Sequence, residues 1–156
     1  MNDPQSPLRQ ASSFPGNLLR RCHQISVAIF LNKGRALELT QLQYIVLSAL
    51  EERGTLDQSR LGGLTALDRN TTAVVVKKLE TRGLVTRERN ARDRRSMLVT
   101  LSAQGRDLRR RAEAVAVDTQ EELMAPLSAA ERETLRALLQ KIADQNNDLS
   151  RVPVVK

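Results

Sequence analysis

The sequence has very few of the residues from which disulfides and protein metal sites are built. Its 156 residues include one cysteine, Cys22, and one histidine, His23. A single thiol excludes an intrachain disulfide and a cysteine-based metal site, and a single imidazole excludes a multi-histidine site. We therefore expect no metal and no other cofactor. The lack of paired cysteines is typical of a cytoplasmic protein.

The usual groups of an enzyme active site are scarce for the same reason. One histidine, one cysteine and no converging cluster of carboxylates leave no nucleophile–base pair of the common kinds. We therefore predict that the chain is not an enzyme.

Aromatic residues and long apolar runs are also lacking. Aromatics make up 2% of the chain, and no segment approaches 18 consecutive apolar residues, so a membrane-spanning helix is not expected. The first fifteen residues lack the apolar run of a signal peptide and are expected to form a flexible arm. Abundant Leu, Ala, Val and Arg favour interlocked helices with few strands.

Positive charge is abundant, and it is concentrated in one part of the chain. Residues 69–111 hold 13 Lys/Arg against 4 Asp/Glu, whereas the remaining residues hold 12 against 14. The overall charge of +7 therefore comes from one local surface. A local basic surface indicates a polyanionic partner.

The residues before this basic region predict two helices. A first helix over residues 17–31, capped by Asn17, has an apolar stripe that we expect to be buried: Leu18, Cys22, Ile25 and Ile29. A loop over residues 31–39 leads to a second helix between its cap Thr40 and Gly54. The predicted buried face of that helix consists of Leu42, Ile45, Val46, Ala49 and Leu50.

The next segment predicts a helix-turn-helix. Asp57 is the N-cap of a short helix over residues 58–64, and a turn over residues 65–67 leads to a second N-cap, Asp68. Gly83 stands where a left-handed helix stop is expected. The inward face of the second helix follows the spacing i, i+3, i+4 and i+7, at Thr72, Val75, Val76 and Leu79.

Two strands and two helices complete the chain. Strands are predicted over residues 84–89 and 97–101, joined by a loop over residues 90–96. Ser102 caps a helix through Leu123, and a capping box at Ser128 and Glu131 opens a last helix. Its apolar side is Leu135, Leu138, Leu139 and Ile142. The fold class is therefore mainly α with a small β-wing, a winged helix-turn-helix of about six helices.

Two groups of residues are candidates for DNA contact. The outward face of the second helix of the helix-turn-helix offers polar groups for base edges and apolar groups for thymine methyls: Asn70, Thr71, Ala73, Val74, Lys77, Lys78 and Thr81. The loop over residues 90–96 offers Arg92, Arg94 and Arg95 to a narrow minor groove. The alternatives are a solvated helix face, for which Val74 is an unusual choice, and a simple soluble turn.

Other charges near these candidates are ambiguous. Asp93 argues that at least one wing arginine is held by an ion pair instead of DNA. The arginines that follow on the next helix either touch flanking phosphates or form an ordinary charged face with Asp107 and Glu113. They are Arg106, Arg109, Arg110 and Arg111.

The segment LDRNTTAVVVKKLETRGLVTRERNARDRRSMLVTLSAQG, residues 67–105, resembles the MarR (multiple antibiotic resistance regulator) family. It is similar to the family's recognition helix, Gly-Leu-Val strand, D-R-R wing and L-T/S-x-x-G exit, and the flanking helices follow in the family's order. The resemblance implies a homodimer that binds a palindromic operator in double-stranded DNA. It also implies a repressor that a small ligand, often an aromatic acid, releases.

The resemblance also divides the chain into functional parts. Residues 16–148 form one domain, with a winged helix over residues 40–101 and dimerisation helices over residues 16–33 and 102–148. Residues 149–156 are expected to be a frayed tail. The apolar side of the last helix, with Leu18 and Phe14, is more apolar surface than one small winged helix can hide, which independently supports a dimer.

The first helix contains the candidates for effector binding. The stretch LLRRCHQISVAIF resembles a subgroup associated with catabolism of aromatic or N-heteroaromatic acids. Arg20 and His23 share one helix face and would bind a carboxylate. The full candidate set is Arg20, His23, Ser26, Phe30, Gln43 and Tyr44. The alternative is that His23 is an ordinary surface or core-edge group.

Two other functions remain open at this point. One branch of the family senses organic hydroperoxides through a first-helix cysteine, but a buried Cys22 would be unreactive. An architectural DNA-binding protein would bind almost independently of sequence, with affinity set mainly by salt.

Overall fold

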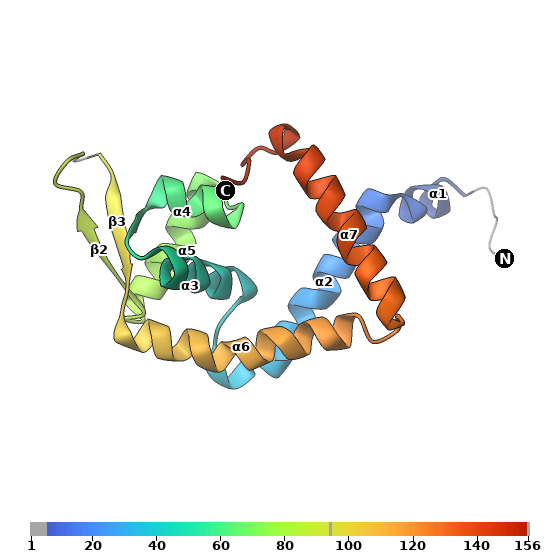
Figure 1. The fold of residues 1–156 in the computed structure, drawn as a ribbon, viewed down its shortest axis with the longest axis horizontal. Helices are drawn as coiled ribbons and strands as arrows, with labels where there is room; N and C mark the ends of the chain where they lie inside the picture. Colours follow the sequence, from blue (N-terminus) through green and yellow to red (C-terminus); the bar gives the residue numbers. More distant parts are fainter. Residues whose placement is uncertain (1–5, 94, 156) are drawn as a thin grey trace.

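The computed structural model describes residues 6–93 and 95–155. The described part of the chain is mainly helical with one small sheet, so the predicted fold class is confirmed (Figure 1). Its elements in chain order are α1 (Pro7–Ser13), α2 (Pro15–Lys33), the 3-10 helix η1 (Arg35–Leu37), α3 (Gln41–Arg53), β1 (Leu56–Asp57), α4 (Gln58–Thr65), α5 (Arg69–Thr81), β2 (Val85–Arg89), β3 (Met97–Leu101), α6 (Ala103–Leu123), α7 (Ala129–Gln145) and η2 (Asn147–Leu149).

The sheet is a wing built on the helix-turn-helix. Its strands are antiparallel in the order β1-β3-β2, with Val85 opposite Leu101 and Arg89 opposite Met97. The short β1 pairs Leu56 with Val99. The hairpin of β2 and β3 therefore projects from the lobe that contains α3, α4 and α5 (Figure 1).

Five helices begin at the short polar residues predicted to cap them. In each case the side-chain oxygen accepts a hydrogen bond from a backbone N–H that the first helical turn leaves unpaired. The caps are Thr40, Asp57, Asp68, Ser102 and Ser128, with donor–acceptor distances of 2.8–3.4 Å. Glu131 and Gln43 complete capping boxes by accepting from the cap residue's own N–H.

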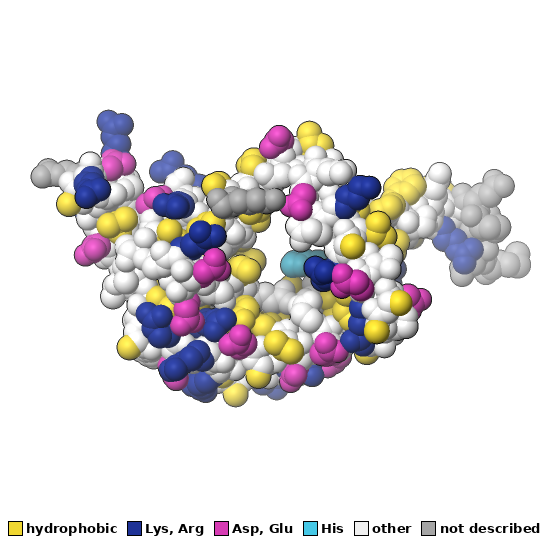
Figure 2. All heavy atoms as spheres, viewed as in Figure 1, with side chains coloured by type: hydrophobic (Ala, Val, Ile, Leu, Met, Phe, Trp, Pro, Cys, Tyr) yellow, Lys and Arg dark blue, Asp and Glu magenta, His cyan; other side chains and the backbone are white. Residues whose placement is uncertain are grey.

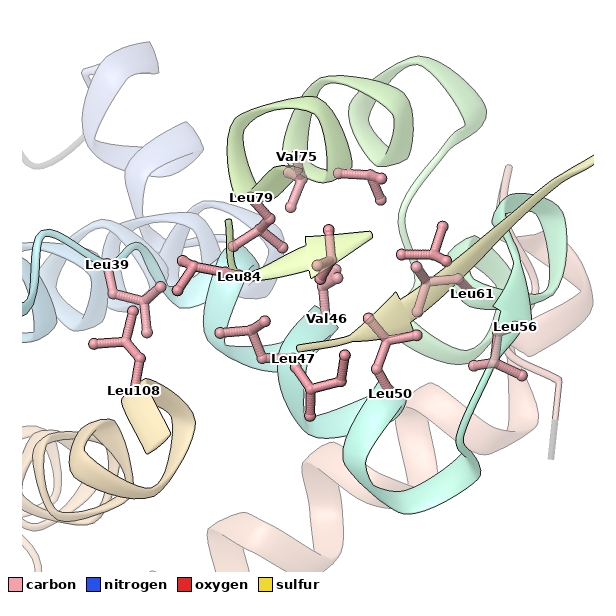
Figure 3. Close-up of a cluster of buried hydrophobic side chains, with 14 of the residues drawn as sticks. Leu39, Val46, Leu47, Leu50, Leu56, Leu61, Val75, Leu79, Leu84 and Leu108 are labelled. Atoms are coloured by element: carbon pink, nitrogen blue, oxygen red, sulfur yellow. The ribbon is translucent and has the colours of Figure 1, made fainter. Parts of the chain in front are cut away.

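The hydrophobic core lies in the winged lobe, between α3, α4, α5 and the sheet (Figure 3). The predicted inward face of α5 is buried in full: Thr72, Val75, Val76 and Leu79. Leu108 and Ala112 of α6 belong to the same core. The long helix α6 is therefore fixed to the winged lobe at its N-terminal half.

The buried face of α3 differs from the prediction. Val46 and Leu50 are buried as expected, but Leu42 and Ile45 are exposed and Gln43 and Leu47 take their place. The capping box explains part of this shift, because the Gln43 carboxamide must turn inward to accept from the Thr40 N–H at 3.0 Å. Leu42 and Ile45 therefore remain exposed to solvent in the single chain.

The buried face of α2 also differs from the prediction. Leu18 and Ile25 are 44% and 49% exposed, and Cys22 is exposed, whereas Ser26 and Phe30 are buried. The helix has two apolar faces, and within one chain only the face toward α6 and α3 is covered. The expectation that the Cys22 thiol is buried is therefore wrong for the single chain.

The start of α2 lies earlier than predicted. Pro15 occupies the first turn, where its missing N–H costs nothing, so the helix begins before Asn17. The Asn17 carboxamide donates instead to the Ala11 carbonyl of α1 at 2.6 Å. This contact joins α2 to a short helix that the sequence did not predict within residues 1–15.

In Figure 1, α1 lies far from the segment that follows η2. α6 runs from the winged lobe to the lobe of α1, α2 and α7, and the chain after α7 returns to α4. The Val155 N–H donates to the Gly63 carbonyl at 3.2 Å, so the tail predicted to be frayed is docked. No helix formed by the described residues has the length and apolar character needed to cross a membrane.

Candidate nucleic-acid interface and effector cleft

The outward face of α5 is polar apart from two exposed aliphatic residues, Ala73 and Val74. Of the predicted DNA contacts on this helix, Thr71 is half-buried and the others are exposed. Val74 is 54% exposed at the middle of the helix. The Thr71 hydroxyl is engaged, because it donates to the Asp68 carboxylate at 3.0 Å. Asn70, Lys77 and Lys78 therefore present the flexible polar groups of this face.

Asp68 holds the start of α5 in place. Its carboxylate accepts from the Thr71 N–H at 2.8 Å and from the Thr71 hydroxyl. These hydrogen bonds, with a smaller contribution from the charge of Arg151, lower the pKa of Asp68. The carboxylate therefore stays charged and committed to the helix start over the ordinary pH range.

The wing loop presents exposed arginines. Arg92 and Arg95 are exposed, and Arg94 lies outside the described residues. The Asp93 carboxylate accepts from the Arg95 backbone N–H at 3.0 Å, and the Asn90 side chain accepts from the Arg92 N–H at 2.9 Å. Among the described residues Asp93 forms no ion pair. It shapes the loop through the backbone, and both described guanidinium groups stay available.

Three of the four arginines of α6 are ion-paired within the chain. Arg106 and Arg109 each lie 3.3 Å from the Glu51 carboxylate of α3, and Arg110 lies 3.4 Å from Asp107. Arg109 also pairs with Glu113 at 3.1 Å. This geometry favours the charged-face interpretation of the α6 arginines and ties α6 to α3.

Two further basic residues have structural roles that the sequence did not predict. The Arg82 guanidinium, just after α5, donates to the Leu37 and Glu38 carbonyls of the α2–α3 connection. Arg87 of β2 lies 2.6 Å from the Glu80 carboxylate, and this hydrogen bond lowers the pKa of Glu80. Both contacts fix the position of the recognition helix α5. Neither side chain is free to read DNA.

A cleft of about 530 Å³ lies between α2, α3 and α5. Its lining comes from three segments: His23, Val27 and Leu31 of α2; Thr40, Gln41, Leu42 and Gln43 at the start of α3; and Asn70, Thr71, Val74, Val75 and Lys78 of α5. Figure 2 shows the molecule hollowed between its two lobes, with the histidine side chain at the edge of the hollow.

The structure brings only some of the predicted effector residues to this cleft. His23 and Gln43 line it, whereas Ser26, Phe30 and Tyr44 are not part of its lining. Phe30 and Tyr44 pack on each other at 6.1 Å between ring centroids. Arg20 is exposed and donates to Gln24 at 3.2 Å.

Ser26 does not line the cleft but contacts a residue that does. The Gln41 carboxamide donates to the Ser26 hydroxyl at 2.8 Å and to its carbonyl at 3.1 Å. Ser26 therefore positions a wall residue that sequence reasoning missed. Leu42 and Lys78 were missed as cleft residues too, because the sequence placed Leu42 in the core and Lys78 on the DNA face.

The cleft suits a small anion with an apolar body. Its walls are largely aliphatic, and Lys78 is the one charged residue among the described residues of its lining. His23 and Asn70 add polar groups beside it, and none of the described lining residues is acidic. Apolar walls with a few placed polar groups are typical of small-molecule sites.

The chain is similar to known transcriptional regulators over most of its length. It is 33% identical over 133 residues to the HTH-type transcriptional repressor NicR of Pseudomonas putida, covering 85% of this chain and 84% of that protein. Its fold matches a probable transcriptional regulator from Pseudomonas aeruginosa with a TM-score of 0.78 and 39% identity, covering 85% of this chain and 98% of the other.

A second solved structure links this fold to a ligand. Bordetella bronchiseptica BpsR, described with a mechanism for regulation of its DNA binding by 6-hydroxynicotinic acid, matches with a TM-score of 0.79 and 34% identity. The match covers 85% of this chain and 95% of that one. Residues 39–97 match the model of the MarR family. The winged helix-turn-helix, its exposed recognition face and these similarities together show that the chain is a transcriptional regulator of the MarR family.

Proposed function

We propose that the chain is a homodimeric repressor that binds an inverted repeat in DNA and is released by a small aromatic or N-heteroaromatic carboxylate. The observation that carries this proposal is the position of α5. One face of this helix is locked in the core, a second is exposed beside the wing, and a third lines the cleft. A ligand in the cleft thus touches the helix that reads DNA.

The DNA-reading role rests on exposed side chains at the two parts of the winged lobe that project outward. Asn70 and Lys77 can hydrogen-bond base edges or phosphates, and Val74 can contact a thymine methyl. Arg92 and Arg95 on the wing suit a narrow minor groove.

The homodimer rests on apolar surface that one chain leaves open. All residues of α7 are described and none is buried, although Leu138 and Ile142 are 53% and 51% exposed apolar side chains. Leu18 and Ile25 of α2 extend the exposed apolar surface. Contiguous apolar surface of this kind marks a protein interface. A second copy of the chain is the partner that covers it.

The effector class rests on the cleft and on two similar proteins. A carboxylate would meet Lys78 and His23, and a flat ring would lie against the aliphatic walls. BpsR, whose DNA binding is regulated by 6-hydroxynicotinic acid, supports an N-heteroaromatic acid. Because Asn70 and Val74 belong both to the cleft and to the outward face of α5, an occupied cleft withdraws DNA contacts.

Two other functions would explain fewer of the observed features. A non-specific architectural binder needs the positive charge but neither exposed Val74 nor a cleft against α5. A redox repressor would depend on Cys22, which lies with Leu18 and Ile25 on the α2 face that the proposed dimer covers.

Binding to matched duplexes tests the repressor function. At fixed salt, the protein should prefer a duplex with its inverted repeat over a scrambled duplex by a factor of about 10³ or more. A ratio near one, with an affinity that depends only on salt, would replace the repressor by an architectural DNA-binding protein.

Adjacent lysines on α5 separate DNA reading from ligand binding. Lys77→Ala should weaken operator binding about ten-fold, because Lys77 points outward and is absent from the cleft. Lys78→Ala should in addition raise the ligand concentration for half-release, because Lys78 lies on the outward face of α5 and also lines the cleft, whereas Lys77 does not line it. Fluorescence anisotropy with a labelled operator measures both quantities. Since each variant loses one charge on the same helix, each is the other's control, and the reverse pattern would refute the assignment.

His23→Ala tests the α2 wall of the cleft. The variant should bind the operator within about two-fold of the parent, because His23 belongs to α2 and not to the outward face of α5. It should need about ten-fold more ligand for release. The probe is whichever of benzoate, nicotinate and 6-hydroxynicotinate releases the parent at the lowest concentration. Equal sensitivity in variant and parent would remove His23 from the site. Failure of all three acids to bind the parent would contradict the effector class.

A further inference from the structure

Residues 147–155 form a structured loop against the winged lobe. The Val155 N–H donates to the Gly63 carbonyl of α4 at 3.2 Å, so this loop lies beside α4 (Figure 1). Val155 packs closely on Gly63, because a Cβ placed at Gly63 would lie 3.0 Å from the Val155 side chain. This contact joins the end of the α7 segment to the helix-turn-helix.

Side chains within the loop hold its shape. The Asn147 carboxamide accepts from the Val154 N–H at 2.8 Å and donates to the Val154 carbonyl at 3.3 Å. The Ser150 hydroxyl accepts from the Val152 N–H at 3.1 Å. Residues 147–155 are therefore tied at both ends, and the position of Arg151 between these ties is restricted.

The loop brings Arg151 to a cleft between the recognition helix and the wing. This cleft, of about 560 Å³, is lined by the first residues of α4 and α5, by residues 95–97 of the wing and by Arg151 and Val152. Arg69 of α5 and Arg95 of the wing line it as well, so three exposed guanidinium groups surround one space.

None of these three arginines forms an ion pair within the described part of the chain, in contrast to Arg106, Arg109 and Arg110 of α6. The charge of Arg151 does contribute to the lowered pKa of Asp68. The two acidic residues of the cleft, Asp57 and Asp68, are engaged as helix caps. Three arginines without ion pairs, between two elements proposed to contact DNA, are suited to bind a phosphate of the DNA.

We propose that the C-terminal loop is part of the DNA-binding surface and that Arg151 binds a backbone phosphate of the operator beside the bases read by α5. The proposal rests on the DNA-binding function. Guanidinium groups bind phosphate oxygens with two parallel hydrogen bonds, and such contacts position a protein on DNA without reading its sequence. Arg69 and Arg95 would hold the same or the neighbouring phosphate.

Arg151→Ala is the direct test. Operator affinity should fall about ten-fold, and affinity for a scrambled duplex should fall equally, because a phosphate contact carries no sequence information. The slope of log affinity against log salt should shrink by about 0.9 for each lost phosphate contact, or about 1.8 for a dimer. Arg151→Lys should retain most of the slope. Arg136→Ala, which removes an arginine paired with Glu133 on α7, is the matched control and should bind like the parent.

Val155→Pro tests whether docking of the loop matters, without a change of charge. Proline removes the N–H that binds Gly63 and should lower operator affinity in the same direction as Arg151→Ala. Combining the two substitutions should add little, since both disable one contact.

The outcomes separate the loop from the rest of the protein. If the parent binds neither the inverted repeat nor the scrambled duplex, the DNA-binding function itself fails. If the parent binds but Arg151→Ala and Val155→Pro match it in affinity and salt slope, only the role of the loop is refuted. Tighter binding by either variant would also refute the proposed role of the loop, because the loop would then weaken DNA binding in the parent.

Discussion

Gly105→Ala should destabilise the protein by about 3 kcal/mol or more, because the added methyl group has no space. A Cβ at Gly105 would lie 2.0 Å from the Leu84 carbonyl oxygen and 2.8 Å from the Leu101 side chain. The obstacle is backbone, which cannot rotate away as a flexible side chain would. Urea unfolding at fixed protein concentration measures the loss.

The surrounding hydrogen bonds explain why this contact is so close. Gly83, at φ +68°, turns the chain after α5, and the Ser102 hydroxyl donates to the Gly83 carbonyl at 2.7 Å. The Ser102 N–H donates to the Leu84 carbonyl at 3.1 Å. The start of α6 is thus bonded directly to the end of the recognition-helix segment, and Gly105 is the residue that permits this approach.

Gly16→Ala is the matched control for this prediction. Gly16 lies in the first turn of α2 with no atom within 4 Å of an added Cβ, so alanine should leave stability unchanged or raise it by up to about 1 kcal/mol. An equal, small effect of both substitutions would contradict the close packing of α6 on Leu84.

Leu138→Asp should disrupt the dimer and lower operator affinity about 100-fold or more. Leu138 is 53% exposed in one chain, so a carboxylate there costs the isolated fold little. In a dimer it would be buried against apolar side chains without a partner, at a cost of several kcal/mol. Analytical ultracentrifugation measures the dimer, and anisotropy measures operator binding.

Ala137→Asp controls for the added charge. Ala137 is the preceding residue of α7 and points away from the stripe of Leu135, Leu138, Leu139 and Ile142. This variant should remain dimeric and bind the operator like the parent. A dimeric Leu138→Asp variant with full affinity would place the interface elsewhere.

The helix boundaries were the most predictable part of the fold, because they depend on local chemistry. A short side chain such as Asp68 or Ser128 caps the backbone within three residues of itself, whatever the rest of the chain does. Likewise, the spacing of Thr72, Val75, Val76 and Leu79 was enough to identify the buried face of α5. The recognition helix could therefore be oriented from sequence alone.

The faces of α2 and α3 could not be assigned in this way. Each helix has apolar residues on more than one side, so periodicity does not reveal which side one chain covers. Leu18, Ile25 and Ile45 are exposed in the single chain although all three fit an apolar stripe. Burial of these side chains depends on a partner chain, and the sequence of one chain does not show where that partner binds.

The effector cleft and the C-terminal loop were only partly predictable for a related reason. His23 and Gln43 were identified, but Lys78 reaches the cleft only because α5 packs beside α2 and α3. Arg151 lies in a segment without periodicity, and its place depends on the fit of Val155 over Gly63. Both features arise from tertiary packing between segments far apart in sequence.

A footprint of the protein on the DNA adjoining its own gene tests whether a symmetric dimer reads an inverted repeat. Two α5 helices related by a two-fold axis should protect one discrete inverted repeat, with half-site centres about one helical turn, roughly 10 bp, apart. Protection of such a repeat that disappears in Leu138→Asp is the predicted result. Uniform protection without a boundary, or protection of a single half-site by the parent, would contradict the account of a symmetric, sequence-reading repressor.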